Sequence, residues 1–401
     1  MLSSTCAACG VSGAKKDCGR CKTTYCSAAC QTQHWKEGGH KDLCKRIKRG
    51  GGAEQYHADK KYAEACAEAI EGCAEATKGR TCYICRDERS TEGLVRGCAC
   101  HTTEGFAHLS CLVREAQVVG EDELRQHNRD KLWIKWAECG LCHQRYHGAV
   151  ARAMARGMWK TYASRPEGDG LRGYALNVLT LAMDGEGEEA LRAAVAYRDW
   201  CSRFDSRNIM TADENLALVY KDAGRYEEAI PIMRQVRAAK LRLLRGSEDE
   251  HSVTSLLNLS ASLAQADRNT EAITLLSKER PAACRALGED HHLCLSLAYA
   301  LGIAHYNHGI ESGDATELLA AGAVLRDAIL RSRKVLGPTH PLTTKRELEF
   351  VRPLEALEKA GCEADILEKL CSGVFRGGWH SEEYEPRSRP GPWKGSEPSA
   401  K

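Results

Sequence analysis

The sequence has few large aromatic side chains, no excess of charge of either sign and no long apolar run. Only four of its 401 residues are phenylalanine, whereas alanine is abundant, and this bias favours packed helices over sheets. The formal net charge of +2 creates no overall field that would attract a nucleic acid or an anionic surface. No window approaches the roughly 18–20 apolar residues of a membrane span. We therefore expect neither a membrane partner nor a specific nucleic-acid partner.

The common catalytic motifs are missing too. There is no Gly-x4-Gly-Lys-Ser/Thr phosphate loop, no Gly-x-Ser-x-Gly turn and no His-Glu-x2-His pair. Cysteine, in contrast, is abundant, with 21 residues. The first residues lack the basic-then-apolar pattern of a secretion signal, and most cysteines have the spacing of metal ligands. Thiolate zinc binding in a reducing compartment, cytoplasmic or nuclear, is therefore favoured over disulfides.

Eight residues with metal-binding side chains fall into four ordered pairs between positions 82 and 142. A structural zinc site takes four nitrogen or sulfur ligands, and a Cys-x2-Cys turn can direct two thiolates at one ion. Four pairs therefore predict two closed zinc sites, although spacing alone does not show which pairs share an ion. The pairs are Cys82 and Cys85, Cys98 and Cys100, His108 and Cys111, and Cys139 and Cys142.

The gaps in this stretch distinguish two kinds of finger that share its ligand order. The pair Cys98-x-Cys100, followed after seven residues by His108, resembles the RING-CH (RING-variant) finger more closely than the PHD finger, which reads histone tails. The resemblance implies an interleaved brace, in which the first and third pairs hold one zinc ion and the second and fourth pairs hold the other. We expect this finger to span residues 80–150.

A RING-CH finger implies an E3 ubiquitin ligase, which docks a ubiquitin-loaded E2 enzyme and performs no chemistry with its own side chains. By position, Ile84 and Leu141 correspond to family residues near the E2 contact. Such fingers often carry a tryptophan where this chain has Glu115. Trp133 and Trp136 would supply the aromatic E2-binding surface in one interpretation and simply pack the finger in the other.

A second set of eight ligands lies within the first 44 residues. With Tyr25 before the fifth ligand, the string resembles the MYND finger, which we place at residues 1–48. MYND fingers bind short, often proline-containing peptides, and Gln31 and Trp35 match positions that line the groove; the alternative for Trp35 is a buried packing role. The resemblance implies that Cys6, Cys9, Cys26 and Cys30 hold one zinc ion and that Cys18, Cys21, His40 and Cys44 hold another.

Both fingers are too small to build a large apolar core, so the metal itself is expected to stabilise them. The ligand count predicts four zinc ions, two per finger. Between the fingers, Gly50–Gly52 breaks the chain, and an alanine-rich stretch follows with apolar residues at steps of three and four. This periodicity predicts a connecting helix over residues 53–78.

Residues 165–371 contain an internal repeat. Joins at Gly246, Gly288 and Gly337 are spaced by 42 and then 49 residues, and the extra seven residues predict a polar loop at 311–317. Each unit has two apolar helical stretches around a turn. Because a helical hairpin cannot bury its own apolar face, such units stack into a right-handed solenoid of three to four repeats.

This pattern resembles the long-period tetratricopeptide repeats of kinesin light chain, most closely over Asn215–Ala229. The resemblance implies a concave face that binds extended peptides or helices, with Asn215 and Asn258 holding the ligand backbone; the alternative for both is a hydrogen bond within a repeat. The basic run from Arg234 to Arg245 is interpreted as a solvated helix face, with a patch for an acidic partner as the alternative. Residues 372–401, rich in Gly, Pro and Ser, are predicted to be disordered.

The predicted fold is therefore mainly α-helical. Two small zinc-stabilised modules, of treble-clef and cross-brace type, precede a right-handed α-solenoid and a disordered tail. Two functions fit this architecture: an E3 ligase whose MYND finger and repeats recruit substrates, and a non-catalytic scaffold whose modules only bind peptides or proteins. They differ at the E2 surface of residues 82–142. A third, chromatin recognition by a PHD-like finger, fits the ligand gaps less well.

Overall fold

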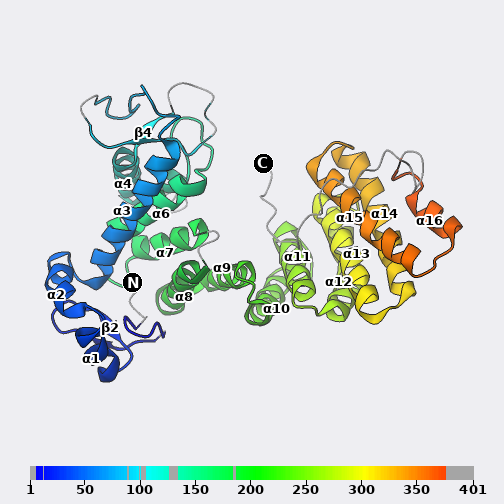
Figure 1. Cartoon of the computed structure of the whole chain (residues 1–401), viewed down its shortest axis with the longest axis horizontal. Helices are drawn as coiled ribbons and strands as arrows, with labels where there is room; N and C mark the ends of the chain where they lie inside the picture. The colour runs from blue at the N-terminus through cyan, green and yellow to red at the C-terminus, as the bar shows by residue number, and fades with distance from the viewer. Residues whose placement is uncertain are drawn as a thin grey trace. The chain divides into compact units, whose positions relative to one another are not determined.

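The computed structural model describes residues 6–11, 13–87, 90–98, 100, 105–125, 134–183 and 187–375. The described chain is mainly helical, as its composition predicts (Figure 1). It divides into two compact units, residues 1–219 and 220–401. In the described ranges, no helix combines the length and the apolar character needed to cross a membrane.

The first unit begins with a small module of two strands and two helices. Ser27 caps its first helix by accepting a hydrogen bond from the Cys30 amide at 3.1 Å. Its core consists of Tyr25, Ile47, Ala53 and several buried cysteines, so little apolar surface is available to stabilise it. The elements are β1 (Lys16–Asp17), which pairs antiparallel with β2 (Thr24–Tyr25), α1 (Ala28–Lys36) and α2 (His40–Arg49).

The predicted connecting helix is α3 (Ala53–Cys73), and it is part of the core of the first unit. It packs along α6 (Gly148–Tyr162) through a row of buried alanines. Two polar contacts reinforce the packing: Gln55 Nε2 donates to the Lys160 carbonyl at 3.0 Å, and Arg172 pairs with Glu54 at 2.7 Å. The helix therefore fixes both fingers to the elements that follow.

The second finger is built around a two-stranded antiparallel sheet and a long helix. Leu94 lies opposite His108 across the sheet, and Phe106, Leu109 and Trp136 are buried beneath it. The elements are β3 (Leu94–Val95), β4 (Ala107–His108), α4 (Leu109–Arg125) and α5 (Ile134–Ala137).

One apolar core runs from the second finger through α6 into the helices behind it. Nine of the 15 residues of α6 are buried, because its small and sulfur-containing side chains face neighbours on several sides. The predicted end of the finger, residue 150, falls inside α6, and the predicted start of the array, residue 165, follows this helix. Both positions lie within the first compact unit, which extends to residue 219.

Consecutive helices of the array pack on one another for the first two helices, in the first unit, and for all of the helices of the second unit. In the second unit, α11 to α16 stack in order along the solenoid (Figure 1). The helices are α7 (Gly170–Ala182), α8 (Gly187–Phe204), α9 (Ile209–Asp222), α10 (Tyr226–Leu243), α11 (Glu250–Gln265), α12 (Asn269–Leu287), α13 (His292–Ser312), α14 (Ala315–Leu336), α15 (Pro341–Lys359) and α16 (Ala364–Cys371), with a 3-10 turn at Ser206–Asn208.

Polar pairs one repeat apart connect consecutive hairpins. Arg237 pairs with Glu279, which lies 42 residues later. Asn269 donates to Glu311, also 42 residues later, at 2.8 Å. Three further pairs, each 41 residues apart, are Arg268 with Glu227, His291 with Glu250 and Arg331 with Asp290. The period expected from the sequence is thus also the period of the contacts.

Two sequence-based expectations differ from the structure. The predicted polar loop at 311–317 is largely helical: α13 continues to Ser312, Gly313 takes a left-handed conformation (φ 70°), and Asp314 caps α14. The first residues of the predicted disordered tail, 372–375, are ordered, because Val374 is buried and Phe375 stacks on Phe350 with ring centroids 6.0 Å apart. Residues 376–401 lie outside the described part.

Candidate metal centres and interaction surfaces

All sixteen predicted ligands come together in four sets of four. Within each set, the ligand atoms lie within 4.8 Å of one another. In both fingers, the first pair of ligands joins the third and the second joins the fourth, which is the interleaving implied by the resemblances. The sets are Cys6, Cys9, Cys26 and Cys30; Cys18, Cys21, His40 and Cys44; Cys82, Cys85, His108 and Cys111; and Cys98, Cys100, Cys139 and Cys142.

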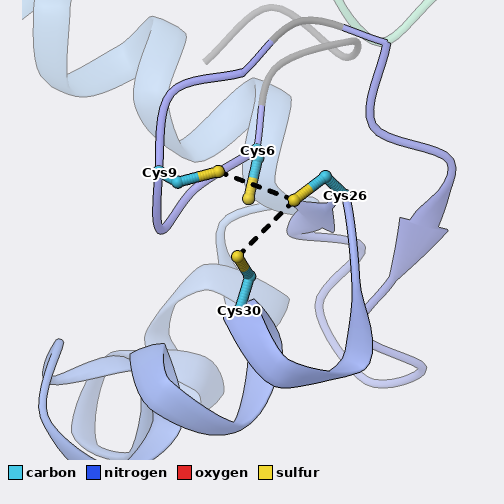
Figure 2. A group of neighbouring side chains, drawn as sticks. All are labelled: Cys6, Cys9, Cys26 and Cys30. Atoms are coloured by element: carbon cyan, nitrogen blue, oxygen red, sulfur yellow. Dashed lines mark hydrogen bonds between the residues drawn. The ribbon is translucent and has the colours of Figure 1, made fainter.

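Figure 2 shows the first set, in which four thiols converge from a loop and the start of a helix. Cys26 Sγ lies 3.5 Å from Cys9 Sγ and 3.5 Å from Cys30 Sγ. A tetrahedral ion with Zn–S bonds of about 2.3 Å would place its sulfur ligands about 3.8 Å apart. The thiols are therefore close to the corners of a zinc tetrahedron. Cys9 and Cys26 are exposed to solvent.

The second set of the same finger is entirely buried. Cys18 Sγ and Cys44 Sγ are 3.9 Å apart, and Cys21 Sγ lies 3.5 Å from His40 Nε2. The spacing of His40 and Cys44 in α2 brings both to the same face, one helical turn apart. A zinc ion at the centre would be bound by three sulfur atoms and the Nε2 atom.

The second finger repeats this arrangement with different ligand pairs. His108 Nδ1 lies 3.4 Å from Cys85 Sγ and 3.7 Å from Cys111 Sγ. In the other set, Cys100 Sγ lies 3.3 Å from Cys98 Sγ and 3.8 Å from Cys139 Sγ. These separations also match the edges of a zinc tetrahedron.

Two thiols of the first set have pKa values that are shifted in opposite directions. Burial acts against ionisation of Cys6, but the amides of Cys26, Cys9 and Ala8 point at its sulfur and lower its pKa to about 6. Cys26 shares protons with Cys30, Cys9 and Cys6, and these hydrogen bonds raise its pKa to about 12. A divalent ion bound by these thiols would displace their remaining protons.

The residues predicted to contact an E2 enzyme occupy different environments. Leu141 is 45% exposed, whereas Ile84 is half-buried and packs against the core. Trp136 is 1% exposed and meets Tyr162 edge-on, with ring centroids 5.9 Å apart. The proposed contact role of Trp136 is therefore wrong, because α6 covers its ring. Trp133 lies outside the described residues.

An ion pair occupies the position where related fingers often carry tryptophan. Glu115 Oε1 on α4 lies 3.4 Å from Lys135 Nζ on α5. A Cβ atom added to Gly140 would be 3.1 Å from Glu115 and 3.2 Å from Lys135, so the pair lies directly over the turn between Cys139 and Cys142. The position that carries tryptophan in related fingers is therefore charged in this chain.

The residues predicted to bind peptides also differ in their exposure to solvent. Trp35 is 39% exposed, so it is not a buried packing residue, and Gln31 beside it is half-buried. Asn215 is 9% exposed and donates to Asn177 Oδ1 at 2.8 Å. The alternative hydrogen bond is thus present, although it joins helices of neighbouring repeats. Asn258, at the equivalent place in α11, is half-buried and has no hydrogen-bond partner among the described residues.

Sequence reasoning missed a polar cluster inside the array. Arg237 and Lys240, assigned to a solvated helix face, are 3% and 9% exposed. Arg237 pairs with Glu248 at 2.5 Å and with Glu279 at 2.7 Å. The signal that could have revealed the cluster is the separation of Arg237 and Glu279, which equals one repeat. Arg234, Arg242 and Arg245, at the two ends of the basic run, face solvent.

Comparisons with known proteins identify two of the modules. Residues 6–44 match the family model of the MYND finger, and residues 208–282 match the model of the tetratricopeptide repeat.

No curated protein matches the chain. One solved structure with similarity is that of a protein described as a kinesin light chain of Podosopora anserina, with nearly identical TPR-like repeats. It is 16% identical with a TM-score of 0.41, covering 56% of this chain and 96% of the other. A second structure of the same description is 17% identical with a TM-score of 0.38, covering 55% and 97%. The chain thus contains a MYND zinc finger followed, further along, by tetratricopeptide repeats, and both are protein-interaction modules.

Proposed function

We propose that the protein is a zinc-stabilised scaffold that brings partner polypeptides together. The observation that carries this proposal is that every ligand of the described fingers belongs to a four-donor set. Four protein ligands close a zinc site and leave no open position for a substrate, so the metal is structural. Because the zinc ions would only stabilise the fold, the function would depend on the surfaces that bind partner polypeptides. We infer four zinc ions per chain and a reducing compartment, cytoplasmic or nuclear, that preserves the thiolates.

Two surfaces are available for peptides. On the MYND finger, the exposed Trp35 next to Gln31 offers an apolar platform of the kind that a proline-containing peptide requires. On the array, the side-chain amide of Asn258 on α11 has no partner in the part of the chain that the structure describes. An amide with both a donor and an acceptor can bind the backbone of an extended ligand. Asn215 is less available because its amide already bonds to Asn177.

Peptide selection from a display library on the full-length chain tests this proposal. Trp35→Ala should abolish capture of the proline-containing ligands, and Asn258→Ala should weaken capture of the others. Two exposed apolar residues provide matched controls, Val11 on the finger and Leu348 on α15, and their alanine variants should bind normally. A library that yields no ligand, or ligands unaffected by either variant, would refute the scaffold proposal.

A second candidate function is an E3 ubiquitin ligase of the RING-CH type. The interleaved sets between residues 82 and 142 favour it, since a cross-brace of this kind is what the family resemblance implies. Leu141 is exposed at the turn of the last ligand pair, where an E2 enzyme would dock. The Glu115–Lys135 pair and the buried Trp136 favour the scaffold instead, because the position of the family tryptophan is charged here and the Trp136 ring is covered.

Autoubiquitination with a panel of E2 enzymes separates the two candidates. The full-length chain is the test protein, and Leu141→Ala is a better probe than a change at the half-buried Ile84. Val118→Ala is the control, because Val118 is similarly exposed, at 42%, but lies on α4 of the same finger. Ubiquitin ladders that disappear only with the Leu141 variant would establish a ligase. If no E2 enzyme gives a ubiquitin ladder while the zinc content is normal, the scaffold function is favoured.

A further inference from the structure

The last helix of the MYND finger carries a concentration of positive charge. Residues 6–50 contain ten Lys or Arg and only three Asp or Glu, although the whole chain has a net charge of only +2. Half of these cations lie on the ten-residue helix α2, and all five are exposed. None of them forms an ion pair within the described residues. They are Lys41, Lys45, Arg46, Lys48 and Arg49.

The stability of the helix does not account for all five cations on α2. Arg46, Lys48 and Arg49 lie in the last turn of α2, where a helix favours cations through its dipole. Lys41 lies in the first turn, where the same dipole disfavours it. Lys45 is one turn from Lys41 and one turn from Arg49, and like charges at this spacing repel one another and destabilise the helix. An anionic partner would relieve this repulsion.

Several basic residues of the tetratricopeptide array, in contrast, form ion pairs. There, Arg234 and Arg268 both pair with Glu271, at 2.5 Å and 2.6 Å, and Arg237 is neutralised by two carboxylates. On α2 the single acidic residue, Asp42, shares the exposed face but forms no ion pair with the surrounding cations. The five cations of α2 therefore lie together without the carboxylate partners that these residues of the array have within the described residues.

One edge of the basic face is apolar. Leu43 is 36% exposed and lies one turn from Arg46 on the same side of α2. The exposed Trp35 is adjacent, since its ring meets the ring of His40 at 5.7 Å and His40 is one turn before Leu43. The basic face from Lys41 to Lys48 is about 10 Å long, the length of about three residues of extended chain.

We propose that α2 docks an acidic stretch of a partner polypeptide, with an apolar side chain of that stretch on the Trp35–Leu43 edge. The inference rests on the proposed peptide binding by the finger and adds the chemical class of its ligand. A polypeptide is favoured over a nucleic acid because the aliphatic Leu43 has no counterpart in a sugar–phosphate backbone. Charge complementarity would raise the association rate and make the affinity depend on salt.

Fluorescence anisotropy with the full-length chain tests the inference with four probes. These are a proline-containing peptide flanked by four serines, the same peptide flanked by four glutamates, a leucine- and glutamate-rich peptide without proline, and a 20-nucleotide single strand. We expect the glutamate flank to tighten binding at least tenfold at 50 mM salt and much less at 500 mM. The peptide without proline should also bind.

Two variants of α2 and one control complete the test. K45E/R46E/R49E should abolish the advantage of the glutamate flank, and K45Q/R46Q/R49Q should reduce it without introducing new charge. K15E/K16E/R20E changes three exposed cations elsewhere on the finger and should preserve it. Zinc content and circular dichroism show that each variant is folded.

The outcomes separate this inference from the proposed function. An equal affinity for the serine and glutamate flanks, an advantage that survives in both α2 variants, or one lost equally in the control would overturn the inference while leaving peptide binding intact. Tighter binding of the single strand than of every acidic peptide would assign α2 to nucleic acid. Failure of all three peptides would overturn both the inference and peptide binding by the finger.

Discussion

Replacing Arg237 with methionine tests how strongly polar pairs hold consecutive repeats together. The guanidinium is 3% exposed and donates to Glu279 at 2.8 Å, to Glu248 at 2.5 Å and to the Ser252 carbonyl at 2.5 Å. Methionine fills much of the same volume but leaves two carboxylates without a cation, and the Glu248 side chain is only 5% exposed. Removing one partner of such a buried pair costs about 3–5 kcal/mol.

Hydrogen exchange of the full-length chain, read by mass spectrometry, measures this cost locally. A loss of about 3 kcal/mol corresponds to an opening equilibrium more than a hundredfold larger, so amides of α10, α11 and α12 should exchange faster by that factor. Arg242→Met is the control, because Arg242 lies on the same helix but faces solvent, and it should change stability by no more than about 0.5 kcal/mol.

The charge-neutral combination separates electrostatics from packing. Replacing Glu248 and Glu279 with glutamine in the Arg237→Met background removes the unpaired charges and should restore most of the lost protection. Equal exchange rates in the Arg237 and Arg242 variants would show that the cluster does not hold the repeats together. A loss that persists in the combined variant would assign the effect to packing.

Three further predictions concern metal, pH and the shared core. A zinc chelator, or an alkylating reagent followed by mass spectrometry, should attack the set containing Cys9 and Cys26 first, because both thiols are exposed; earlier loss from the buried set of the same finger would contradict this. Cys98→Ser should lower protection in α6 and α7 as well as in the second finger, since they share one core, and a change confined to the finger would show that the core is not continuous. Hydrogen bonds from the backbone and side chain of Ser252 lower the pKa of Asp249, although burial opposes the shift. The Asp249 cap on α11 should therefore stabilise the fold by about 1 kcal/mol at neutral pH. This stabilisation should be lost as the pH falls below the usual range of aspartate and the carboxylate becomes protonated. Asp249→Asn should retain a cap and flatten that acid dependence of protection in α11, whereas an unchanged pH profile would refute the assignment.

The zinc sets could be predicted from the sequence because their information is local. Each pair of ligands is fixed by a spacing of two to four residues, and a four-coordinate ion then demands that pairs combine. The pairing itself needed a family resemblance. The environment of Trp136 could not be predicted in this way, because the ring is covered by Tyr162, which lies 26 residues later on a different helix.

The basic run in α10 shows a second limit of sequence reasoning. Cations at steps of three and four on one helix look like a solvated face when only that helix is considered. Arg237 is buried because its carboxylate partners come from the next repeat. Trp35, in contrast, could not be assigned to either of its roles until its exposure was known. In both cases the missing information was the neighbour in space.

The hairpin of α13 and α14 shows how a solenoid can change the length of a repeat. α11 and α12 have 16 and 19 residues, whereas α13 and α14 have 21 and 22, while the turn between the helices of the hairpin shortens. The seven extra residues of this unit therefore add about one turn to each of two antiparallel helices. Because 3.6 residues restore the same face, the inner faces keep their register with neighbouring hairpins. Insertions of about seven residues, shared between both helices of a hairpin, should thus be tolerated in this fold, whereas an insertion of two residues within one helix would rotate its buried face towards solvent.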